Sequence, residues 1–436
     1  MLHVAIVGSG PAGFYTAEGL VKTFGEGVHV DIIDRLPTPY GLIRAGVAPD
    51  HQSIKAVDKR YAATAVLPQV RFVGHVEVGP KNGHAGVTIP ELLGLYDAVV
   101  LATGAPLDRP LGVPGEDLPG VIGSSAFVGW YNGHPDFADL EVPLGHPGAC
   151  VIGNGNVAID VARILAKTPE ELGASDIVRH TREVLEHSKI ERIHLIGRRG
   201  PYQASFTPKE MGELGHLARA QPYVHAEHLP DAAGDAALEP GLRKTVGHLR
   251  SFAATEAQGK PLAIRFDFLT RPVAVEQAGD HLRLIVEGTR LDGDMAVGTG
   301  EMRSIDCGLI VTCIGYRTSP IEGVAYDERA GRFLNSDGRI EAGLYATGWA
   351  RRGPSGTIGT NRPDAFAVIE RIAAEVVPSG KAGSDGLDAL LGGRGIVPTT
   401  FAHWQRIDAA EVAAARPGSP REKFVRRADL LGASGG

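Results

Sequence analysis

Cysteine is scarce in this sequence, and the three that occur, Cys150, Cys307 and Cys313, form no C-x-x-C pair. Each lies in an apolar, strand-like run, where a small buried side chain is the usual interpretation. The spacing therefore offers no redox disulfide, zinc site or iron–sulfur cluster, and we expect no metal site. No apolar run approaches the length of a transmembrane helix, so no membrane association is expected.

Positive charge is not in excess. With 44 Lys and Arg against 51 Asp and Glu, the net charge is −7, which gives no general reason to bind nucleic acid or an anionic membrane. The first residues enter a strand without the pattern of a signal or transit segment, so a cytoplasmic location is expected. The length of 436 residues, with 43% hydrophobic and 22% charged residues, predicts a soluble globular protein of two domains.

The chain begins with a strand, a glycine-rich turn and a helix. Residues 3–7 are apolar, Gly8, Gly10 and Gly13 follow with GxGxxG spacing, and residues 14–20 continue as a helix. In such a turn the first glycine permits the tight bend, the second lets the backbone approach a pyrophosphate, and the third lets the helix pack close to the strand. The phosphates would rest on amide N–H groups at the positive end of the helix.

The residue that follows the next strand indicates which nucleotide binds. After the first turn this residue is Asp34, an acceptor for ribose hydroxyls. The pattern repeats at Gly153-Asn154-Gly155-Asn156-Val157-Ala158, but here the equivalent position holds Arg198 and Arg199. Guanidinium groups grip a 2′-phosphate through charge-assisted bonds, so the second nucleotide is predicted to be NADP(H). The simpler alternatives are a glycine turn in an ordinary βα unit and a solvated basic loop.

Both patterns predict an α/β fold with two Rossmann-like dinucleotide-binding domains, similar to glutathione reductase. Strands at residues 96–105 and 343–348 both reach a Thr-Gly pair, so the chain is expected to return to its first domain. We predict a discontinuous FAD-binding domain, 1–105 and 336–436, around an NADP-binding domain, 106–335. The second FAD part should end in short helices with a frayed terminus.

Two nucleotide sites in one chain imply that a nicotinamide and a flavin meet. Hydride would pass from C4 of NADPH to N5 of the flavin, and the protein would supply charges around N1 and N5. Because the sequence has no cysteine pair, onward transfer through a disulfide lacks its chemistry. Oxygen and an external one-electron carrier remain as electron acceptors.

Motifs outside the glycine turns occur in order over nearly the whole chain. They are Pro39-Tyr40-Gly41-Leu42-Ile43-Arg44, Gly46-Val47-Ala48-Pro49-Asp50-His51, Val113-Pro114-Gly115-Glu116, Phe127-Val128-Gly129-Trp130-Tyr131-Asn132, Gly197-Arg198-Arg199-Gly200-Pro201, Gly348-Trp349, Arg352-Gly353-Pro354 and Gly356-Thr357-Ile358-Gly359. In these motifs the sequence closely resembles the ferredoxin–NADP reductases of the adrenodoxin-reductase type. The resemblance implies FAD, NADPH, a small iron–sulfur ferredoxin as electron acceptor, and a monomer that forms transient complexes.

The resemblance also implies which residues hold the two nucleotides. In addition to the glycines of the first turn, the residues implied to hold FAD are Ala12, Asp34, Leu42, Val76, Trp349, Gly356, Thr357 and Ile358. Those for NADP are Arg109, Asn154, Gly155, Asn156, Val157, Arg198, Arg199, Glu210 and Gly356. The sequence departs from the family at Asp34, where Glu is common, and at Tyr40, where Trp or Phe is usual.

Three titratable residues are candidates for the reaction itself. His51 would lie near the flavin and assist its protonation, since imidazole titrates near neutral pH. Asp160 and Glu213 would steady His51 or the positive nicotinamide. The alternatives are a histidine that packs locally in its loop and two acids on the polar faces of helices.

Arg243, Lys244 and Arg250 lie on a predicted helix and form a candidate docking face for an acidic ferredoxin, because opposite charges speed encounter. A solvated charged face is the alternative. The sequence as a whole predicts an FAD-dependent NADPH:ferredoxin reductase. Two rival functions are an NADPH-dependent flavin oxidase or oxygenase, and a flavin-binding interaction subunit without catalytic activity.

Overall fold

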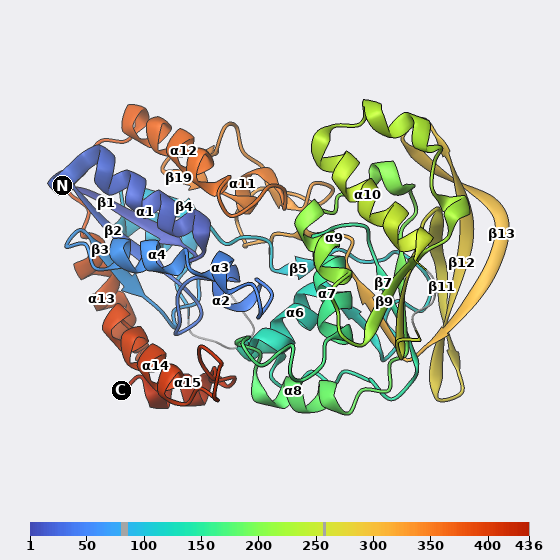
Figure 1. Ribbon diagram of the computed structural model, residues 1–436. Helices are drawn as coiled ribbons and strands as arrows, with labels where there is room; N and C mark the ends of the chain where they lie inside the picture. The colour runs from blue at the N-terminus through green and yellow to red at the C-terminus, as the bar shows by residue number, and fades with distance from the viewer. Residues whose placement is uncertain (80–85, 256–258, 436) are drawn as a thin grey trace. The chain divides into compact units, whose positions relative to one another are not determined.

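The computed structural model describes residues 1–79, 86–255 and 259–435, and the chain divides into two compact units. Unit 1 contains residues 1–107, 132–138 and 316–436, and unit 2 contains residues 108–131 and 139–315. Unit 1 is drawn mainly in blue, orange and red in Figure 1, and unit 2 mainly in green and yellow. The predicted FAD-binding ranges include residues 80–85 and 436, which lie outside the described residues.

A six-stranded sheet forms the centre of unit 1, in the order β18-β19-β4-β1-β2-β3. The strands are β1 (Leu2–Val7), β2 (Val28–Ile33), β3 (Val70–Val73), β4 (Ala98–Leu101), β18 (Arg339–Glu341) and β19 (Leu344–Ala346). All neighbours from β19 to β3 pair in parallel, and β18 pairs antiparallel with β19. The part of the chain after unit 2 therefore completes the sheet that the N-terminal residues begin.

Helices cover both faces of this sheet. Alternate residues of β1 point to opposite sides: Val4 and Ile6 join one core cluster, and Ala5 and Val7 join the other. The first cluster includes α1 (Pro11–Phe24), α4 (Asp58–Ala65) and α12 (Asn361–Glu375), and the second includes α5 (Ile89–Leu95) and α13 (Gly383–Gly393). Helices α1 and α12 lie side by side (Figure 1). Burial on both faces explains why β1 and β4 are continuous apolar runs.

Unit 2 contains a second six-stranded sheet, in the order β6-β14-β7-β8-β10-β9, and all its strands are parallel. The strands are β6 (Val121–Gly123), β7 (Gly148–Ile152), β8 (Arg192–Ile196), β9 (Ala220–Val224), β10 (Leu262–Asp267) and β14 (Leu309–Thr312). Strand β1 in unit 1 and β7 in unit 2 each lie between a strand that follows directly and one that comes later. This doubly wound arrangement confirms the predicted fold class.

One core cluster of unit 2 joins its parallel sheet to an antiparallel sheet of three strands, which the sequence analysis did not predict as a sheet. These strands are β11 (Thr270–Ala278), β12 (His281–Asp292) and β13 (Met295–Cys307), drawn as long curved ribbons in Figure 1. Leu284 and Val286 of β12 contact the same cluster as Cys150 and Ile152 of β7. The helices of this unit include α6 (Ser124–Asn132), α7 (Asn156–Ala166), α8 (Arg179–Glu186), α9 (Pro208–Leu214) and α10 (Pro240–Ala254).

The chain returns to unit 1 at Tyr316, earlier than the predicted position 336. Residues after this point already bond within unit 1: the Thr318 hydroxyl donates to the carbonyl of Gly104 at 2.8 Å, and Arg332 donates to the carbonyl of Arg351 at 3.0 Å. The short strands here are β16 (Tyr326–Asp327) and β17 (Arg332–Phe333). The assignment of FAD to one unit and NADP to the other stays a prediction.

The predicted short helices are present near the C-terminus. Helices α14 (Phe401–Ala413) and α15 (Arg427–Ala433) place Trp404, Ile407 and Leu430 in the first core cluster of unit 1. These apolar side chains have a core to bury against, so the segment is packed as far as α15; the predicted frayed end falls on Gly436, which lies outside the described residues. Among the described residues, no helix combines the length and apolar character needed to cross a membrane.

Candidate functional site

The first glycine turn forms an open cradle at the end of β1. Gly8 has φ +110°, and a Cβ there would lie 2.5 Å from the carbonyl oxygen of Ala102. A Cβ on Gly13 would lie 2.0 Å from the carbonyl oxygen of Gly8, so helix α1 can approach the strand only without that carbon. A Cβ on Gly10 would meet nothing within 4 Å, and no side chain caps α1 at this residue. The helix N-terminus thus has room for a phosphate, as FAD requires.

Asp34 follows β2 and holds this turn in place. Its Oδ2 atom accepts hydrogen bonds from the backbone N–H of Ser9 at 2.8 Å and from the Ser9 hydroxyl at 2.5 Å. Its Oδ1 atom accepts from the N–H of Leu36 at 2.9 Å. A carboxylate has about four acceptor positions, so capacity remains for a ribose hydroxyl. The predicted ribose contact stays a prediction, and support of the glycine turn is a second role that the sequence did not indicate.

Other residues predicted to hold FAD also lie near this turn. Gly348 has φ +65°, and a Cβ there would lie 2.5 Å from the Cβ of Ala12, which brings the start of α11 (Trp349–Arg352) beside α1. Val76 is buried, and its N–H donates to the carbonyl of Asp34 at 2.9 Å. Leu42 begins the short helix α2 (Leu42–Ala45).

Asp364, in the first turn of α12, holds the turn that precedes α11 and the two arginines of α11. Its Oδ2 atom accepts from the N–H of Gly348 at 2.5 Å and from the Thr347 hydroxyl at 3.1 Å. The same carboxylate forms ion pairs with Arg351 at 3.0 Å and with Arg352 at 3.3 Å. Asp364 is not among the residues predicted from the sequence. An acid in the first turn of the helix after a glycine-rich loop was the available signal.

Of the predicted residues, Trp349 begins α11, and Gly356, Thr357 and Ile358 lie in the loop that follows it. The indole N–H of Trp349 donates to the carbonyl of Ser355 at 3.0 Å, and its ring stacks on Tyr316 with centroids 6.1 Å apart. Gly356 has φ +82°. Gly356 and Thr357 are exposed, so their backbone groups are accessible to a ligand.

The second glycine turn, at the end of β7, repeats this geometry in unit 2. Gly153 has φ +145°, and a Cβ there would lie 2.2 Å from the carbonyl oxygen of Cys313. Gly155 begins α7 without a capping side chain, and its added Cβ would meet only the Ser205 hydroxyl, at 3.3 Å. The side chain of Asn154 packs against Gly197, where a Cβ would overlap it. This helix N-terminus is likewise open to a phosphate.

Residues after β8 are bonded to the second turn. The N–H of Thr207 donates to Oδ1 of Asn156 at 2.8 Å, and the Thr207 hydroxyl donates to Oε2 of Glu210 at 2.6 Å. The Ser205 hydroxyl donates to the carbonyl of Asn154 at 2.9 Å. Glu210 is buried and tied to Thr207, so in this structure it helps to shape the turn. Val157 lies in the first turn of α7.

Arg198 and Arg199 follow β8 and are both exposed. Hydrogen bonds hold the backbone of both residues. The Thr289 hydroxyl donates to the carbonyl of Arg198 at 2.7 Å, and the N–H of Leu269 donates to the carbonyl of Arg199 at 3.3 Å. Within the described residues, no carboxylate forms an ion pair with either guanidinium group. Two anchored residues with available positive charge fit a 2′-phosphate. The backbone of Arg109, also predicted to hold NADP, donates to the carbonyl of Gly315 at 3.0 Å.

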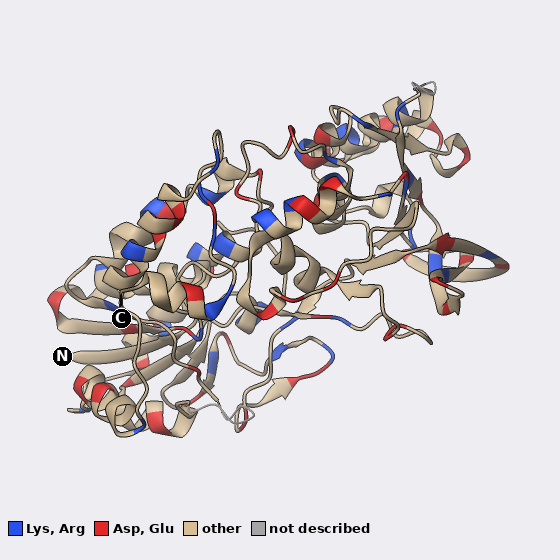
Figure 2. Ribbon diagram, turned by 90° about the horizontal axis from the view of Figure 1, so that it is seen from below, with Lys and Arg blue, Asp and Glu red and all other residues tan. Residues whose placement is uncertain are grey.

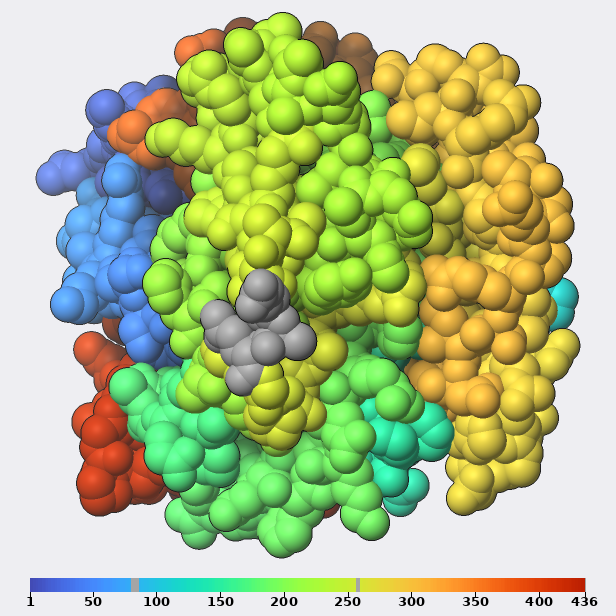
Figure 3. All heavy atoms as spheres, turned by 45° about the vertical axis from the view of Figure 1, so that its right-hand side comes forward, coloured from blue at the N-terminus to red at the C-terminus, as the bar shows by residue number. Residues whose placement is uncertain are grey.

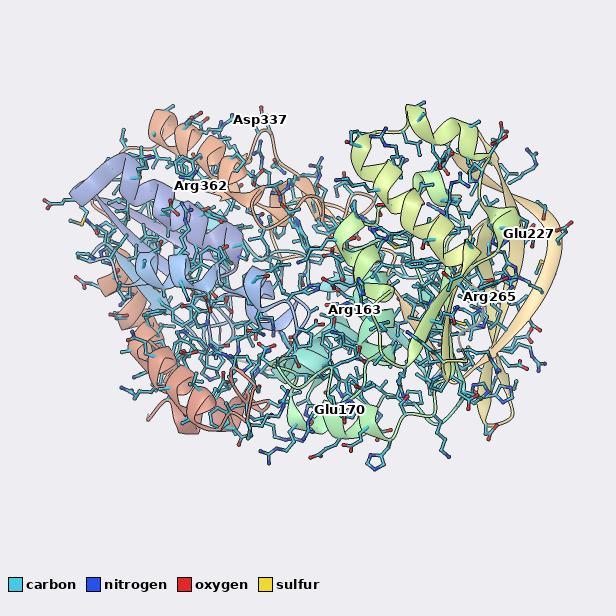
Figure 4. All side chains as sticks on the ribbon, in the orientation of Figure 1. Arg163, Glu170, Glu227, Arg265, Asp337 and Arg362 are labelled. Atoms are coloured by element: carbon cyan, nitrogen blue, oxygen red, sulfur yellow. The ribbon has the colours of Figure 1, made fainter. Side chains whose placement is uncertain are left out.

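The structure brings Asp160 and Glu213 together through a third residue, Arg163 of α7, which is labelled in Figure 4. Arg163 is only 1% exposed; its Nη2 atom lies 2.8 Å from Asp160, and its Nε atom lies 3.3 Å from Glu213. A buried charge needs such partners, so neutralising Arg163 is a structural role for both acids. Their predicted roles toward His51 and the nicotinamide stay predictions.

His51 is a buried residue of unit 1, whereas Asp160 and Glu213 belong to unit 2. The carbonyl of His51 accepts the N–H groups of Ile54 and Lys55, at 3.0 Å and 3.2 Å, at the start of α3 (Gln52–Lys55).

The cysteines are free thiols in unit 2. A hydrogen bond with Cys307, together with burial, raises the pKa of the Cys150 thiol well above its ordinary value. Burial likewise raises the pKa of Cys313. Because the thiolate is the reactive form, these thiols are poorly suited to disulfide exchange. In the described part of the chain, no group of three or more His, Cys, Asp and Glu side chains could hold a metal ion.

Comparison with known proteins decides the family. Human mitochondrial NADPH:adrenodoxin oxidoreductase is 40% identical to this chain over 98% of the chain and 91% of the human protein. The NADPH-ferredoxin reductase FprA of Mycobacterium tuberculosis is 39% identical over 98% of each protein. The chain belongs to the NADPH:ferredoxin/adrenodoxin reductase family. The resemblance predicted from the sequence is thereby confirmed, and the chain is an oxidoreductase.

The reductase family is also supported by a solved structure and a family profile. The structure of Mycobacterium tuberculosis FprA in complex with NADPH superposes with a TM-score of 0.94, at 38% identity, over 100% of both chains. A profile described as pyridine nucleotide-disulphide oxidoreductase matches residues 2–199. Disulfide-reducing members of such a family need a pair of reactive cysteines. Among its described residues, this reductase has no such pair.

We expect Asp364→Asn to weaken FAD binding about tenfold or more, because a hydrogen bond to a charged group contributes roughly 1.5–3 kcal/mol and tenfold corresponds to about 1.4 kcal/mol. The neutral amide removes the charge that pairs with Arg351 and Arg352, and its single acceptor oxygen cannot replace both carboxylate oxygens toward Gly348 and Arg351. Flavin fluorescence titration of the apoprotein measures the affinity. Glu370→Gln removes an exposed charge from the same helix and should leave it unchanged. Equal affinities in the two variants would contradict the assignment.

Proposed function

We propose that the chain transfers electrons from NADPH, by way of bound FAD, to an iron–sulfur ferredoxin. In the balanced reaction, NADPH and two oxidised ferredoxins give NADP⁺, a proton and two reduced ferredoxins. When bound, FAD supplies the conversion between two-electron and one-electron chemistry. The observation that carries the proposal is a pair of open glycine turns, one followed by Asp34 and the other by the exposed Arg198 and Arg199.

Each turn would bind a pyrophosphate through N–H groups at a helix N-terminus. Arg198 and Arg199 would bind the 2′-phosphate of NADPH, and Asp34 would orient a ribose of FAD while holding Ser9. The loop around Gly356 follows α11, which Asp364 holds at Gly348 and Arg351, and it would face the flavin with exposed backbone groups. His51 would hold or move a proton near the flavin.

A one-electron carrier suits this chain better than a disulfide acceptor, because the thiols of Cys150 and Cys313 are held protonated. The names of the human and mycobacterial relatives, an adrenodoxin oxidoreductase and a ferredoxin reductase, support the same acceptor class. We further propose a monomer that forms transient complexes in the cytoplasm and binds neither nucleic acid nor membrane. The net charge of −7 supports the last two statements.

Of the three residues predicted to form a docking face for the ferredoxin, Arg250 is not available for that role. Arg250 of α10 is paired with Asp235 at 2.5 Å, and this hydrogen bond lowers the pKa of Asp235 to about 2. Arg250 is therefore neutralised locally, whereas Arg243 and Lys244 are exposed. Figure 3 shows atoms of α10 at the surface, and Figure 2 shows acidic and basic residues intermixed along the ribbon. Docking would thus depend on Arg243 and Lys244 rather than on a broad basic region.

The proposed function predicts that NADPH bleaches the flavin under anaerobic conditions and that added ferredoxin restores its colour. The double variant Arg198→Ala and Arg199→Ala should lose about a hundredfold or more in preference for NADPH over NADH, since each charge-assisted contact is worth roughly 1.5–3 kcal/mol. Arg192→Ala, an exposed arginine at the other end of β8, is the matched control. A wild-type chain that prefers NADH, or that oxidises NADPH with oxygen as fast as with ferredoxin, would refute the proposal.

The role of His51 predicts that His51→Gln slows flavin reduction by about a hundredfold, the lower end of general acid–base contributions, while NADPH affinity is preserved. Stopped-flow reduction of the flavin by NADPH measures both quantities. His187→Gln, an exposed histidine of unit 2, provides the control. An unchanged rate and affinity in His51→Gln would reject the role.

Docking through α10 predicts that Arg243→Glu raises the KM for an acidic ferredoxin about tenfold at low ionic strength and reduces the salt dependence of the rate. Reduction of ferricyanide by NADPH, which needs no protein partner, should not change. Arg290→Glu makes the same charge change at an exposed position of β12. If both variants behave alike, ferredoxin does not dock on α10.

A further inference from the structure

Residues 399–427, here called the C-terminal strap, contact the segment that follows the first nucleotide-binding strands in unit 1. We propose that this strap is part of the flavin site: it fixes the turn at Tyr40 and Gly41, and Glu411 and Lys423 are positioning residues for that turn. The inference rests on the proposed binding of FAD at the first glycine turn. Nothing in the sequence pattern links the two segments, which are separated by more than half of the chain.

The turn lies directly against the first glycine turn. The N–H of Tyr40 donates to the carbonyl of Ser9 at 3.0 Å, and a Cβ on Gly41 would lie 2.9 Å from the Cα of Gly10. Tyr40 has φ +83° and Gly41 has φ +50°. A side chain as large as tyrosine rarely adopts such a backbone, and it persists only where surrounding contacts impose it. The contacts that impose it should therefore govern the position of Ser9 and Gly10.

Aromatic side chains supply the first of these contacts. The ring of Tyr40 is 5% exposed and meets the ring of Trp404 edge-on, with centroids 5.6 Å apart. On another side it meets Phe14 of α1 at 5.5 Å. The guanidinium carbon of Arg44 lies 5.2 Å from the centroid of Trp404, in a cation–π arrangement. Trp404 thus contacts Tyr40, in the turn, and Arg44, in the helix α2 that follows the turn.

A buried ion pair supplies the second contact. Two nitrogens of Arg44 donate to the carboxylate of Glu411, at 2.8 Å and 2.5 Å, and Glu411 is fully buried. The N–H of Phe424 donates to the same carboxylate at 3.0 Å. Bidentate geometry fixes the orientation of both groups, and removing one partner of a buried pair leaves an uncompensated charge. Glu411 therefore couples α14 to α2.

Lys423 supplies the third contact. Its buried ammonium group donates to the carbonyl of Arg44 at 3.2 Å and to the carbonyl of Asn132 at 3.1 Å. The Asn132 amide in turn donates to the carbonyl of Val47 at 3.0 Å and accepts from Lys55 at 3.1 Å. These bonds bracket the loop that carries His51. The strap consequently holds the backbone from Tyr40 to Lys55 at several points.

The test compares Glu411→Gln with Asp385→Asn, an exposed acid of α13 that lies outside the strap. Asp408 of α14 is not a suitable control, because Arg421 pairs with both Asp408 and Glu411. FAD affinity is measured by fluorescence titration, the flavin environment by visible circular dichroism of the holoprotein, and stability by thermal unfolding. We expect Glu411→Gln to raise the Kd for FAD at least tenfold and to alter the visible spectrum. Asp385→Asn should change the Kd by less than twofold, whatever it does to the melting temperature.

Two outcomes would overturn the inference: an unchanged Kd and spectrum in Glu411→Gln, or equal changes in both variants. If Glu411→Gln does not fold, Arg44→Lys is measured in the same way. Arg44→Lys keeps the charge but loses the bidentate contact, so it should raise the Kd for FAD. Glu411→Asp keeps a carboxylate toward Arg44, so it should raise the Kd less than Arg44→Lys does. A wild-type chain that binds no FAD would instead refute the proposed function, so the two failures are distinguishable.

Discussion

The structure depends on the close approach of a helix N-terminus to the end of a parallel strand. At residue 13 a side-chain carbon would lie 2.0 Å from the Gly8 carbonyl oxygen, so only glycine allows α1 to lie where it does. This approach leaves the first N–H groups of the helix uncapped and directed at open space beside Gly10. Unit 2 repeats the tight bend at Gly153 and the uncapped helix start at Gly155, although Ala158 stands where unit 1 has Gly13. The constraint common to both turns is therefore the bend at Gly8 and Gly153, where a side-chain carbon would meet the carbonyl oxygen of Ala102 or Cys313.

What distinguishes the two turns is the charge that follows the adjacent strand. Asp34 uses three of its acceptor positions on Ser9 and Leu36, so the acid stabilises its own turn as well as any ribose it binds. Arg198 and Arg199 are held by their carbonyls instead, which leaves their charged groups exposed. The same backbone architecture can thus present opposite charges to two related nucleotides. Selection of the phosphorylated coenzyme requires no change of fold.

The sequence predicted what local patterns can specify. Glycine spacing, apolar runs and the charge after each second strand identified both parallel sheets and both turns. Asp160 and Arg163 are one turn apart on α7, but local patterns could not predict the burial of Arg163 against Glu213, because that contact depends on packing of α7 with α9. The ion pair of Arg44 with Glu411 and the bonds of Asp364 also join residues that no short-range periodicity connects. For the antiparallel sheet of unit 2 the sequence indicated only a strand near residues 282–286 and a hairpin-like region after it, because its strands are half exposed and interrupted by register shifts.

The order of segments along the chain has a consequence for how the flavin site is assembled. Strand β19, the Asp364 helix and the C-terminal strap all come after unit 2 in the sequence, yet they complete the sheet and contact the turns that the first 51 residues form. The N-terminal glycine turn alone therefore lacks the groups that fix Gly348 and Tyr40. Since an unfavourable backbone such as that of Tyr40 persists only under external contacts, the proposed role of the strap implies that the first unit reaches its binding geometry only once the last residues have packed. On that proposal, high-affinity flavin binding would require the C-terminal residues as well as the N-terminal pattern.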